Sequence, residues 1–316
     1  MANSNIIFGP VNSRRFGVSL GIDLSPALKQ CNFDCLYCEL APAATVDQQS
    51  DTISINSIMD ALGIALDVHP DIDVITFTAN GEPTLYPDLA ELIKRVDAIK
   101  GDKETLILTN SATLVDEKTF KTLLDFDQVK LSLDAVTHEV FKKIDRPHHG
   151  IDIDAVAERV IAFAEQFKGK LYIEVLFVRG LNDTSEEIAA INDILKQIDA
   201  ERIDLGTIDR PPAYPVEGLS FSELHSAAQQ FDSALPIHIA SRQHAEMVAS
   251  SYSDEEIVNT LDKRPLTHDD IKHLFDAPSQ ERLKLLISRK LICEYERARV
   301  TFLMPCKNIG RKRQKS

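Results

Sequence analysis

Residues 18–38 read VSLGIDLSPALKQCNFDCLYC and join a predicted strand to a dense group of cysteines. Residues 18–24 form a short apolar run that ends in polar and proline punctuation, which is typical of a buried strand. Residues 31–38 carry three cysteines with the spacing C-x3-C-x2-C. One short loop therefore directs three thiolates at a common centre, directly after the first predicted strand.

This cysteine spacing favours an iron–sulfur cluster with one open corner. A [4Fe–4S] cube has four iron corners, so Cys31, Cys35 and Cys38 would leave one iron without a protein ligand. A small molecule can chelate that iron and accept an electron from it. Structural zinc is an alternative, but it takes four closed ligands, typically with a second C-x2-C pair that the chain lacks. Three incidental core cysteines are the other alternative.

Apolar strand-like runs alternate with helical patterns over the first two-thirds of the chain. Such alternation requires parallel pairing and right-handed crossovers. A dinucleotide-binding sheet is the weaker option because no GxGxxG follows the first strand. We predict an α/β fold, a partial (β/α)6 TIM-like barrel over residues 1–245, with functional residues at strand ends. The predicted strands are 18–24, 74–78, 105–109, 129–133, 171–178 and 202–208, and the predicted helices are 55–67, 88–99, 116–124, 152–167 and 185–198.

The C-terminal part has a different pattern. Three short helices are predicted at residues 254–262, 267–275 and 279–289, and a hairpin at 291–295 and 299–303. We interpret residues 252–304 as a winged-helix-like module and residues 305–316 as a basic, disordered tail. Cys293 and Cys306 lie in this part, and two thiols are too few for a second cluster. We expect both to be buried or free.

Charge is unevenly distributed along the chain. The net charge is −14, which argues against wholesale coating of nucleic acid. Residues 253–316 carry 14 Lys and Arg against 10 Asp and Glu, a balance of +4, so the other residues carry −18. This asymmetry favours two units with different partners.

The third helix of the predicted module is the natural groove reader of a winged helix. Its basic residues would give the module a salt-dependent affinity for RNA or DNA. The alternative is that its apolar residues pack a core while the charges are solvated, and that the module serves structure or protein contacts. The basic residues are Arg282, Lys284, Arg289 and Lys290.

The distribution of apolar residues also indicates the cellular compartment of the protein. No apolar run approaches the roughly 18–20 residues needed to cross a bilayer, so no membrane contact is expected. Residues 1–5 have neither a basic region nor an apolar stretch after them and do not form a secretory signal. We expect a cytoplasmic protein, with its thiols kept reduced.

The cysteine motif, with Tyr37 before the last cysteine, resembles the signature of the radical S-adenosylmethionine (SAM) superfamily. The resemblance implies a partial or full barrel that binds S-adenosyl-L-methionine to the unique iron of the [4Fe–4S] cluster. It implies reductive cleavage to a 5′-deoxyadenosyl radical, which takes a hydrogen atom from the substrate. Tyr37 would lie close to the adenine. A flavodoxin or ferredoxin would supply the electron.

Further residues at predicted strand ends fit the same resemblance. Asn80-Gly81-Glu82-Pro83 resembles the family's GGEP motif, which receives the amino group of SAM, although Asn80 stands where Gly is commonest. In the superfamily, polar groups at strand ends commonly reach the methionyl carboxylate and the ribose. The corresponding candidates are Asn110, Ser132 and Asp134, with Glu174 and Thr207 as weaker ones. Strand-end capping and turn chemistry are the alternative for each.

Two further segments resemble the subgroup related to the wyosine-base synthases of transfer RNA. They are residues 13–17, which read SRRFG, and residues 209–212, which read DRPP. The chain lacks that group's N-terminal cysteine set and its flavodoxin-like domain. Planar guanidinium groups could bind a substrate anion, or could form surface salt bridges. These arginines are Arg14, Arg15, Arg146 and Arg210.

The leading functional hypothesis is a radical SAM enzyme whose substrate is a nucleoside in RNA, a peptide or protein residue, or a small metabolite. The alternative is a regulator in which the cluster senses redox state and the winged helix binds DNA. That alternative explains the cysteines and the C-terminal module. It does not explain a barrel pattern with SAM-site residues at its strand ends.

Overall fold

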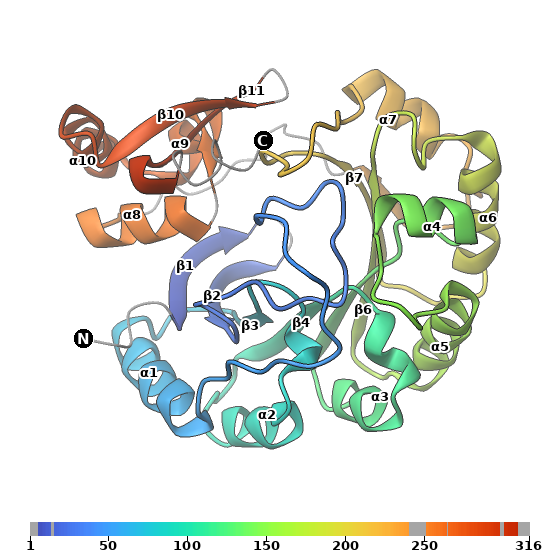
Figure 1. Ribbon diagram of the computed structural model, residues 1–316. Helices are drawn as coiled ribbons and strands as arrows, with labels where there is room; N and C mark the ends of the chain where they lie inside the picture. Colours follow the sequence, from blue (N-terminus) through green and yellow to red (C-terminus); the bar gives the residue numbers. More distant parts are fainter. Residues whose placement is uncertain (1–5, 14–15, 240–250, 264, 298–299, 309–316) are drawn as a thin grey trace.

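One eight-stranded sheet forms the larger part of the molecule (Figure 1). The computed structural model describes the chain except for residues 1–5, 14–15, 240–250, 264, 298–299 and 309–316. Strands β2 to β8 pair in parallel in chain order, and β1 pairs antiparallel with β2. Within the described residues β8 does not pair with β1, so the sheet is an open, partial barrel. The strands are β1 (Ile7–Ser13), β2 (Gly17–Asp23), β3 (Val74–Thr78), β4 (Glu104–Thr109), β5 (Gln128–Ser132), β6 (Lys170–Phe177), β7 (Arg202–Thr207) and β8 (Ile237–Ile239).

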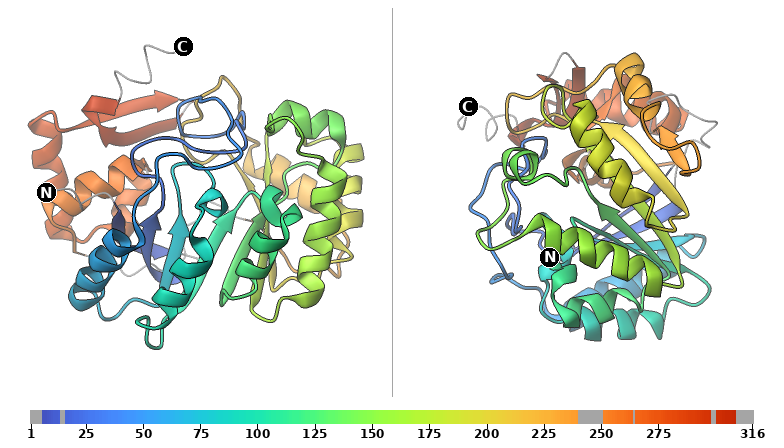
Figure 2. Two further views of the ribbon diagram at one scale, coloured as in Figure 1. Left: turned by 60° about the horizontal axis from the view of Figure 1, so that its bottom comes forward. Right: turned by 90° about the vertical axis from the view of Figure 1, so that its right-hand side faces the viewer.

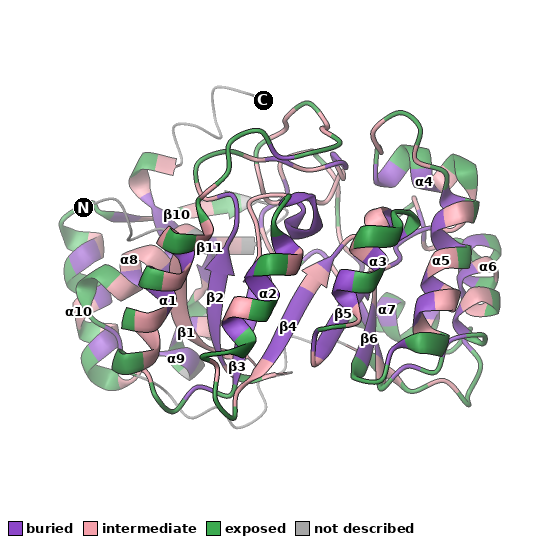
Figure 3. Cartoon of the chain, turned by 90° about the horizontal axis from the view of Figure 1, so that it is seen from below, coloured by how far each residue is buried: buried purple, intermediate pink, exposed green. Residues whose placement is uncertain are grey.

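Helices cover the outer, convex face of this sheet (Figure 2). In α2 the buried residues Leu89, Leu92, Ile93 and Val96 recur every three or four positions, so one face of the helix packs on the strands. Figure 3 shows the same division, with buried strands and helices whose exposed residues point outward. The helices are α1 (Ile55–Val68), α2 (Leu89–Asp97), α3 (Glu117–Leu123), α4 (His138–Ile144), α5 (Ile153–Gln166), α6 (Ser185–Leu195) and α7 (Phe221–Ala228), with 3-10 turns at Pro83–Leu85 and Ala112–Val115.

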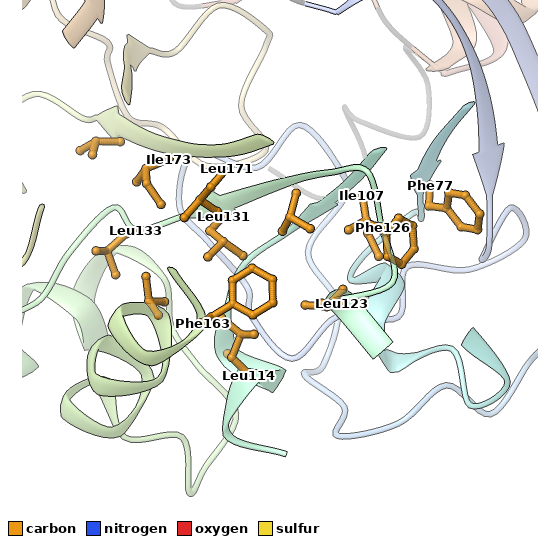
Figure 4. Close-up of a cluster of buried hydrophobic side chains, with 14 of the residues drawn as sticks. Phe77, Ile107, Leu114, Leu123, Phe126, Leu131, Leu133, Phe163, Leu171 and Ile173 are labelled. Atoms are coloured by element: carbon orange, nitrogen blue, oxygen red, sulfur yellow. The ribbon is translucent and has the colours of Figure 1, made fainter. Parts of the chain in front are cut away.

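The main hydrophobic core lies between the strands and these helices (Figure 4). Phe77 of β3 meets Phe126 edge to face, with 5.0 Å between ring centroids. Phe163 of α5 meets Phe120 of α3 at 5.4 Å in the same arrangement. These rings pack into the core between the strands and the helices.

The inner, concave face is polar. Because side chains alternate along a strand, the residues between the core positions point inward. Lys130 of β5 forms an ion pair with Glu174 of β6. Asp204 of β7 is fully buried and pairs with Arg202 at 2.9 Å and His238 at 3.1 Å. These ion pairs place charged side chains of neighbouring strands on the inner face.

Aromatic packing closes the amino ends of the strands. The Phe16 ring lies 5.0 Å from the Tyr172 ring, measured between centroids. The Arg202 guanidinium lies over both rings, 5.6 Å from the centroid of Phe16 and 4.8 Å from that of Tyr172. This packing lies at the amino ends of β2, β6 and β7.

The sequence prediction gives the six strands β2 to β7 and misses β1 and β8. β1 contains Gly9-Pro10 and an irregular register between Phe8 and Val11, which hides its alternation. β8 has only three residues. Helices α4 and α7 are also missed, with seven and eight residues respectively. The α/β partial barrel itself is confirmed.

The C-terminal module contains three helices and a three-stranded sheet of order β10-β11-β9. Its core includes Ile257, Phe275 and Leu303. The three helices are as predicted, whereas β9 adds a strand that the sequence analysis did not include. The winged-helix assignment remains a prediction. The elements are α8 (Asp254–Lys263), β9 (Leu266–Thr267), α9 (His268–Leu274), α10 (Ala277–Ser288), β10 (Ile292–Arg297) and β11 (Val300–Pro305).

The predicted groove reader, α10, uses its basic residues within the module. Arg282 donates to the backbone oxygen of Tyr252 at 2.8 Å. Lys284 pairs with Glu281 at 2.6 Å, one turn earlier in the helix. These contacts agree with the structural alternative for both residues. The predicted tail begins inside β11, which includes Pro305, and residues 309–316 lie outside the described part of the chain.

Cys293 and Cys306 form a disulfide, which corrects the expectation that they are separate thiols. β10 and β11 pair antiparallel with Ile292 opposite Pro305, and the Cα atoms of the two cysteines are 5.0 Å apart. Their separation of 13 residues in the sequence concealed this proximity.

The module packs on the first strand of the sheet. Helix α8 contacts β1, and the Tyr252 hydroxyl lies 3.5 Å from the backbone oxygen of Pro10. His69, which ends α1, lies 3.9 Å from the Glu256 carboxylate of α8. Figure 2 shows the module beside β1 and β2. No helix among the described residues is long and apolar enough to cross a membrane.

Candidate active site

The three clustered cysteines lie in a long loop after β2, at the carboxyl ends of the strands. Cys31, Cys35 and Cys38 are half-buried and unlinked. The Cys38 amide donates to the Cys35 carbonyl at 3.1 Å, which forms a tight turn between them. The Val46 amide donates to the Cys31 carbonyl at 2.9 Å and folds the rest of the loop back.

The last turn of α4 and the residues after it support this loop from one side. The amides of Asp34 and Leu36 donate to the carbonyls of Asp145 and Ile144 at 3.1 and 2.8 Å. Cys35 lies between these two attachments. We call residues 142–149 the backing segment because its backbone holds the loop on both sides of Cys35.

The segment after β3 supports the loop from the other side. The Gln30 amide donates to the Asn80 carbonyl at 2.9 Å, and the Glu82 amide donates to the Gln30 carbonyl at 3.0 Å. Gly81 has φ +137°, and a Cβ atom there would stand 2.0 Å from the Gln30 oxygen. Only glycine allows the two backbones to approach this closely. The predicted Asn80-Gly81-Glu82 motif thus fixes the position of the cysteine loop.

Burial dominates the electrostatic surroundings of these thiols. Burial first, and then the Glu82 carboxylate, raises the pKa of Cys31 to about 12. Burial raises the pKa of Cys35 well above its ordinary value, with contributions from Asp145, Cys31 and Cys38. Without a metal these cysteines are neutral thiols. A metal cluster deprotonates coordinating thiols outright, so three free thiols in one loop fit a cluster.

A buried cation accompanies the thiols. The Lys29 ammonium lies 3.1 Å from the Asp34 carboxylate, and its side chain is only 9% exposed. Burial lowers its pKa, but Cys38, Asp34 and Cys31 together raise the pKa above the ordinary lysine value. Lys29 therefore stays charged and is placed to offset the negative charge of metal-bound thiolates.

The Glu82 carboxylate is fully engaged by the protein. It accepts hydrogen bonds from the Thr84 amide at 3.0 Å, the Thr109 hydroxyl at 2.6 Å and the Asn110 amide at 2.8 Å. Burial raises its pKa, while these hydrogen bonds act in the opposite direction. In this arrangement the carboxylate ties the ends of β3 and β4 together.

Asn110 brings the end of β4 to the cysteine loop. Its side-chain amide donates to Asn32 Oδ1 at 2.6 Å and lies 3.8 Å from the Cys31 sulfur. Asn80 is held by its backbone N–H group, which donates to Asp23 Oδ1 at 3.1 Å. Both predicted residues lie at the same rim of the sheet as the cysteines.

Tyr37 and Asp134 meet directly. The Tyr37 hydroxyl donates to one carboxylate oxygen of Asp134, and the Leu176 amide donates to the other at 2.6 Å. Burial raises the pKa of Asp134 to about 7. Burial also raises the pKa of the neighbouring Asp145, whose Oδ1 atom is buried without a hydrogen-bond partner among the described residues.

A small cavity lies beside these groups. Its volume is about 10 Å³, enough for about one water molecule. It is lined by Tyr37, Asn110, Ser132, Asp134 and Asp145, together with apolar side chains of α4 and α5. The structure thus brings three of the predicted strand-end residues together with Tyr37.

The weaker candidates take structural contacts. The Thr207 hydroxyl donates to the Phe177 carbonyl at 2.9 Å and accepts from the Leu219 amide at 2.7 Å. Glu174 pairs with Lys130 on the concave face. Neither lies among the residues that line the cavity beside Tyr37.

The predicted arginines divide into two groups. Arg146 lies 3.3 Å from the Asp34 carboxylate and stacks on the Tyr214 ring, 4.8 Å from its centroid. Arg210 pairs with Glu39, one residue beyond the last loop cysteine. Both therefore brace the loop. Arg14 and Arg15 lie outside the described residues.

Sequence reasoning missed Lys29, Gln30, Asp34 and Asp145. The Gln30 side chain accepts from the Asp51 amide at 3.1 Å and donates to the Asp51 carbonyl at 2.8 Å, which closes the long loop. A signal for these residues was present, since three of them flank the cysteines directly in the sequence. Asp145 gave no comparable signal because it lies more than a hundred residues from the loop.

The partial barrel, with three free cysteines in a loop across the carboxyl ends of its strands, defines a class of metal-binding α/β proteins. The family model "Radical SAM superfamily" matches residues 26–191. The chain belongs to this superfamily, as the cysteine motif predicted. The matched range begins just before the cysteine loop and extends into α6.

A curated relative covers almost the whole chain. The UPF0026 protein of Helicobacter pylori (strain J99) is 38% identical over 296 residues, which are 92% of this chain and 96% of the relative. That identity extends the resemblance beyond the residues matched by the family model.

Solved structures show the same fold. A radical SAM methyltransferase from Sphaerobacter thermophilus superposes with a TM-score of 0.56 and 13% identity, covering 72% of this chain and 67% of that one. SuiB from Streptococcus suis superposes with a TM-score of 0.54 and 18% identity, covering 72% and 50%. At this identity the likeness concerns the fold alone.

The superfamily uses a [4Fe–4S] cluster and S-adenosylmethionine. In this chain the loop thiols of Cys31, Cys35 and Cys38 are the residues that would hold the cluster, which would supply the electron for reductive cleavage of SAM. Tyr37, Asn110, Ser132 and Asp134 line the small cavity described above.

Proposed function

We propose that this protein is a radical SAM enzyme that cleaves S-adenosylmethionine reductively and abstracts a hydrogen atom from a substrate inside the barrel. The observation that carries the proposal is the loop of three free cysteines whose backbone is fixed at the carboxyl ends of the strands. The polar concave face leads away from that loop, and packing around Phe16 and Tyr172 closes its far end. A substrate would therefore enter at the rim that carries the cysteines.

The protein residues have separate roles in this proposal. Lys29 offsets thiolate charge, and the Gln30 and Gly81 backbones hold the loop at the strand ends. Tyr37 and Asp134 bind and orient SAM, with Asn110 and Ser132 beside them. The cofactor carries the difficult chemistry, and the protein supplies orientation and exclusion of water.

The substrate is proposed from two short segments that flank the first and last long strands of the barrel. The resemblance of residues 13–17 and 209–212 to the wyosine-base synthases favours a nucleoside in RNA, while a peptide or a small metabolite is the alternative. RNA or protein contact through the C-terminal module would have to use residues other than Arg282, whose guanidinium is engaged within the module.

The decisive experiment is anaerobic reconstitution with iron and sulfide, followed by dithionite and SAM and an assay for 5′-deoxyadenosine. Product from the wild type and none from Cys35→Ala is the expected result. Cys293→Ala is the matched control, because it removes a cysteine outside the loop, and it should retain product formation.

A well-formed cluster that neither binds SAM nor yields 5′-deoxyadenosine would overturn the proposal. In that case the redox-sensing regulator becomes the leading hypothesis, and DNA binding that changes with the oxidation state of the cluster is its test. Binding of SAM without cleavage would point to a missing substrate or reductant, and addition of candidate RNA, peptide or metabolite substrates would resolve it.

A further inference from the structure

The backing segment carries exposed positive charge directly behind the cysteine loop. Lys142 and Lys143 form the last turn of α4 and are exposed, as is His149. The ion pairs of this region in the described chain join Arg146 to Asp34, and His138 to Asp152 and Asp154. Neither lysine takes part in them. The exposed acids of the same region, Glu139, Asp152 and Asp154, lie at the opposite, amino end of α4. The two lysines are therefore a local exception on a chain whose net charge is −14.

The same segment provides a short covalent and hydrogen-bonded route to the loop. Lys143 is bonded to Ile144, whose carbonyl accepts the Leu36 amide at 2.8 Å, and Leu36 is bonded to Cys35. On the other side, the Asp145 carbonyl accepts the Asp34 amide at 3.1 Å. A single hydrogen bond therefore separates the exposed lysine turn from the backbone next to a cluster-binding cysteine.

We propose that Lys142, Lys143 and the adjoining exposed part of the backing segment form the docking surface for an acidic electron-transfer protein. This inference rests on the proposed function, which requires an electron from outside the chain. In the step concerned, one electron passes from a reduced flavodoxin or ferredoxin to the oxidised cluster. The donor is oxidised and the cluster is reduced by one electron, and no bond is formed or broken.

Charge and size favour this partner over RNA. A few lysines suit a small, transient redox interface, which commonly buries less than about 1,200 Å². A nucleic-acid surface that makes about 6–10 phosphate contacts would need more basic side chains than the two exposed lysines supply. Figure 2 shows α4 at the same end of the sheet as the cysteine loop.

An alternative explanation is that the two lysines only stabilise the C-terminus of α4. Cations in the last turn of a helix stabilise it modestly, because its carbonyl groups carry partial negative charge. Lys94 occupies the same kind of position in the last turn of α2, and Lys118 lies beside it along a surface groove between α2 and α3. This pair offers a control with the same change of charge.

The experiment compares the Lys142→Glu, Lys143→Glu double variant with the Lys94→Glu, Lys118→Glu double variant. Each holoprotein is titrated with an oxidised acidic flavodoxin, and separately with a [2Fe–2S] ferredoxin, at increasing salt. Cluster reduction is then followed by absorbance, with the reduced donor and with dithionite. The Lys142→Gln, Lys143→Gln variant provides a milder change, and equal iron content shows that each protein carries its cluster.

The proposal predicts that the charge reversal in the backing segment weakens donor binding and slows donor-driven reduction at least about tenfold at low salt. The glutamine variant should fall between it and the wild type. The difference should shrink to about twofold or less at high salt, because the charges are screened. Reduction by dithionite should be unchanged in all variants, and the control variant should behave as the wild type.

Equal effects in the two double variants, or no effect in either, would overturn the proposal. Unchanged donor binding with weaker binding of an RNA oligonucleotide would assign the surface to RNA instead. Failure of the proposed function is distinguishable, since it is the absence of SAM cleavage with dithionite in the wild type. Donor binding and cluster reduction can be measured whatever that result.

Discussion

The cysteine loop and the C-terminal hairpin hold their cysteines in opposite ways. In the loop, three cysteines within eight residues remain unlinked, because hydrogen bonds fasten the backbone to the segments after β3 and α4. In the hairpin, Cys293 and Cys306 are 13 residues apart and are joined, because antiparallel pairing brings their Cα atoms to 5.0 Å. The backbone scaffold, and not the distance along the sequence, decides which thiols meet.

The largest predicted effect is a loss of bound iron when a loop cysteine, and not a hairpin cysteine, is replaced. Cys38→Ser should abolish reconstitution of a stable [4Fe–4S] cluster, because two thiolates and one hydroxyl replace three thiolates. Cys293→Ser should retain the full iron content of the wild type. Iron and sulfide analysis after anaerobic reconstitution measures both. Loss of iron in Cys293→Ser would show that the C-terminal pair contributes to metal binding and would break the comparison.

A second prediction concerns the scaffold of the loop. Gly81→Ala should destabilise the cluster-free protein by about 3 kcal/mol and reduce iron uptake, because the new Cβ would stand 2.0 Å from the Gln30 oxygen at φ +137°. Chemical denaturation provides the measurement. The matched control is Gly101→Ala, where φ is +65° but no atom lies within 4 Å. Equal effects of the two substitutions would show that the loop does not depend on this close contact.

A third prediction concerns the hairpin. The Cys293→Ser, Cys306→Ser double variant should lower the stability of the C-terminal module by about 2–4 kcal/mol, because the unfolded chain loses the constraint of a 13-residue crosslink. Urea denaturation with and without a thiol reductant measures this effect. The reductant should move the wild-type midpoint to that of the variant. A midpoint that does not respond to the reductant would indicate that the two thiols are not joined in solution.

The smallest predicted effect is a pH dependence of the free energy of unfolding, caused by Asp134, which contacts Tyr37 of the cysteine loop. The pKa of Asp134 is raised to about 7, against about 3.9 for an unfolded aspartate. Its protonated form therefore stabilises the folded state fully below about pH 4, and this contribution is lost as the pH rises through about 7. The free energy of unfolding of cluster-free wild type should fall, relative to that of Asp134→Asn, by about 2 kcal/mol between about pH 5.5 and pH 8. A difference that is constant with pH would contradict the raised pKa.

The sequence predicted those parts of the molecule that follow from local pattern. Strands β2 to β7 are apolar runs between polar turns, and the cysteine spacing identified the superfamily. β1 escaped prediction because Gly9-Pro10 interrupts it, and its strand character depends on pairing with β2. The disulfide escaped because it depends on the register of a hairpin.

At the candidate site, too, the residues marked by a local sequence pattern were predicted and those that depend on long-range contacts were not. Tyr37 was predicted from its place before the last loop cysteine, and Asn110, Ser132 and Asp134 were predicted from their places at strand ends. The structure gathers all four around one cavity. The buried role of Glu82, which ties β3 to β4 through Thr109 and Asn110, could not be inferred from a motif. Long-range contacts of this kind are set by tertiary packing and leave no local pattern.

The contact between α8 and β1 has a consequence for synthesis of the chain. β1 is made among the first residues, whereas Tyr252, whose hydroxyl lies 3.5 Å from the Pro10 oxygen, is made about 240 residues later. At the usual rate of about 5–20 residues per second, the outer edge of the sheet waits on the order of ten seconds or more for its cover. An open strand edge is a template for pairing with other chains. Removal of the C-terminal module should therefore increase aggregation of the nascent barrel before it affects any property of the cysteine loop.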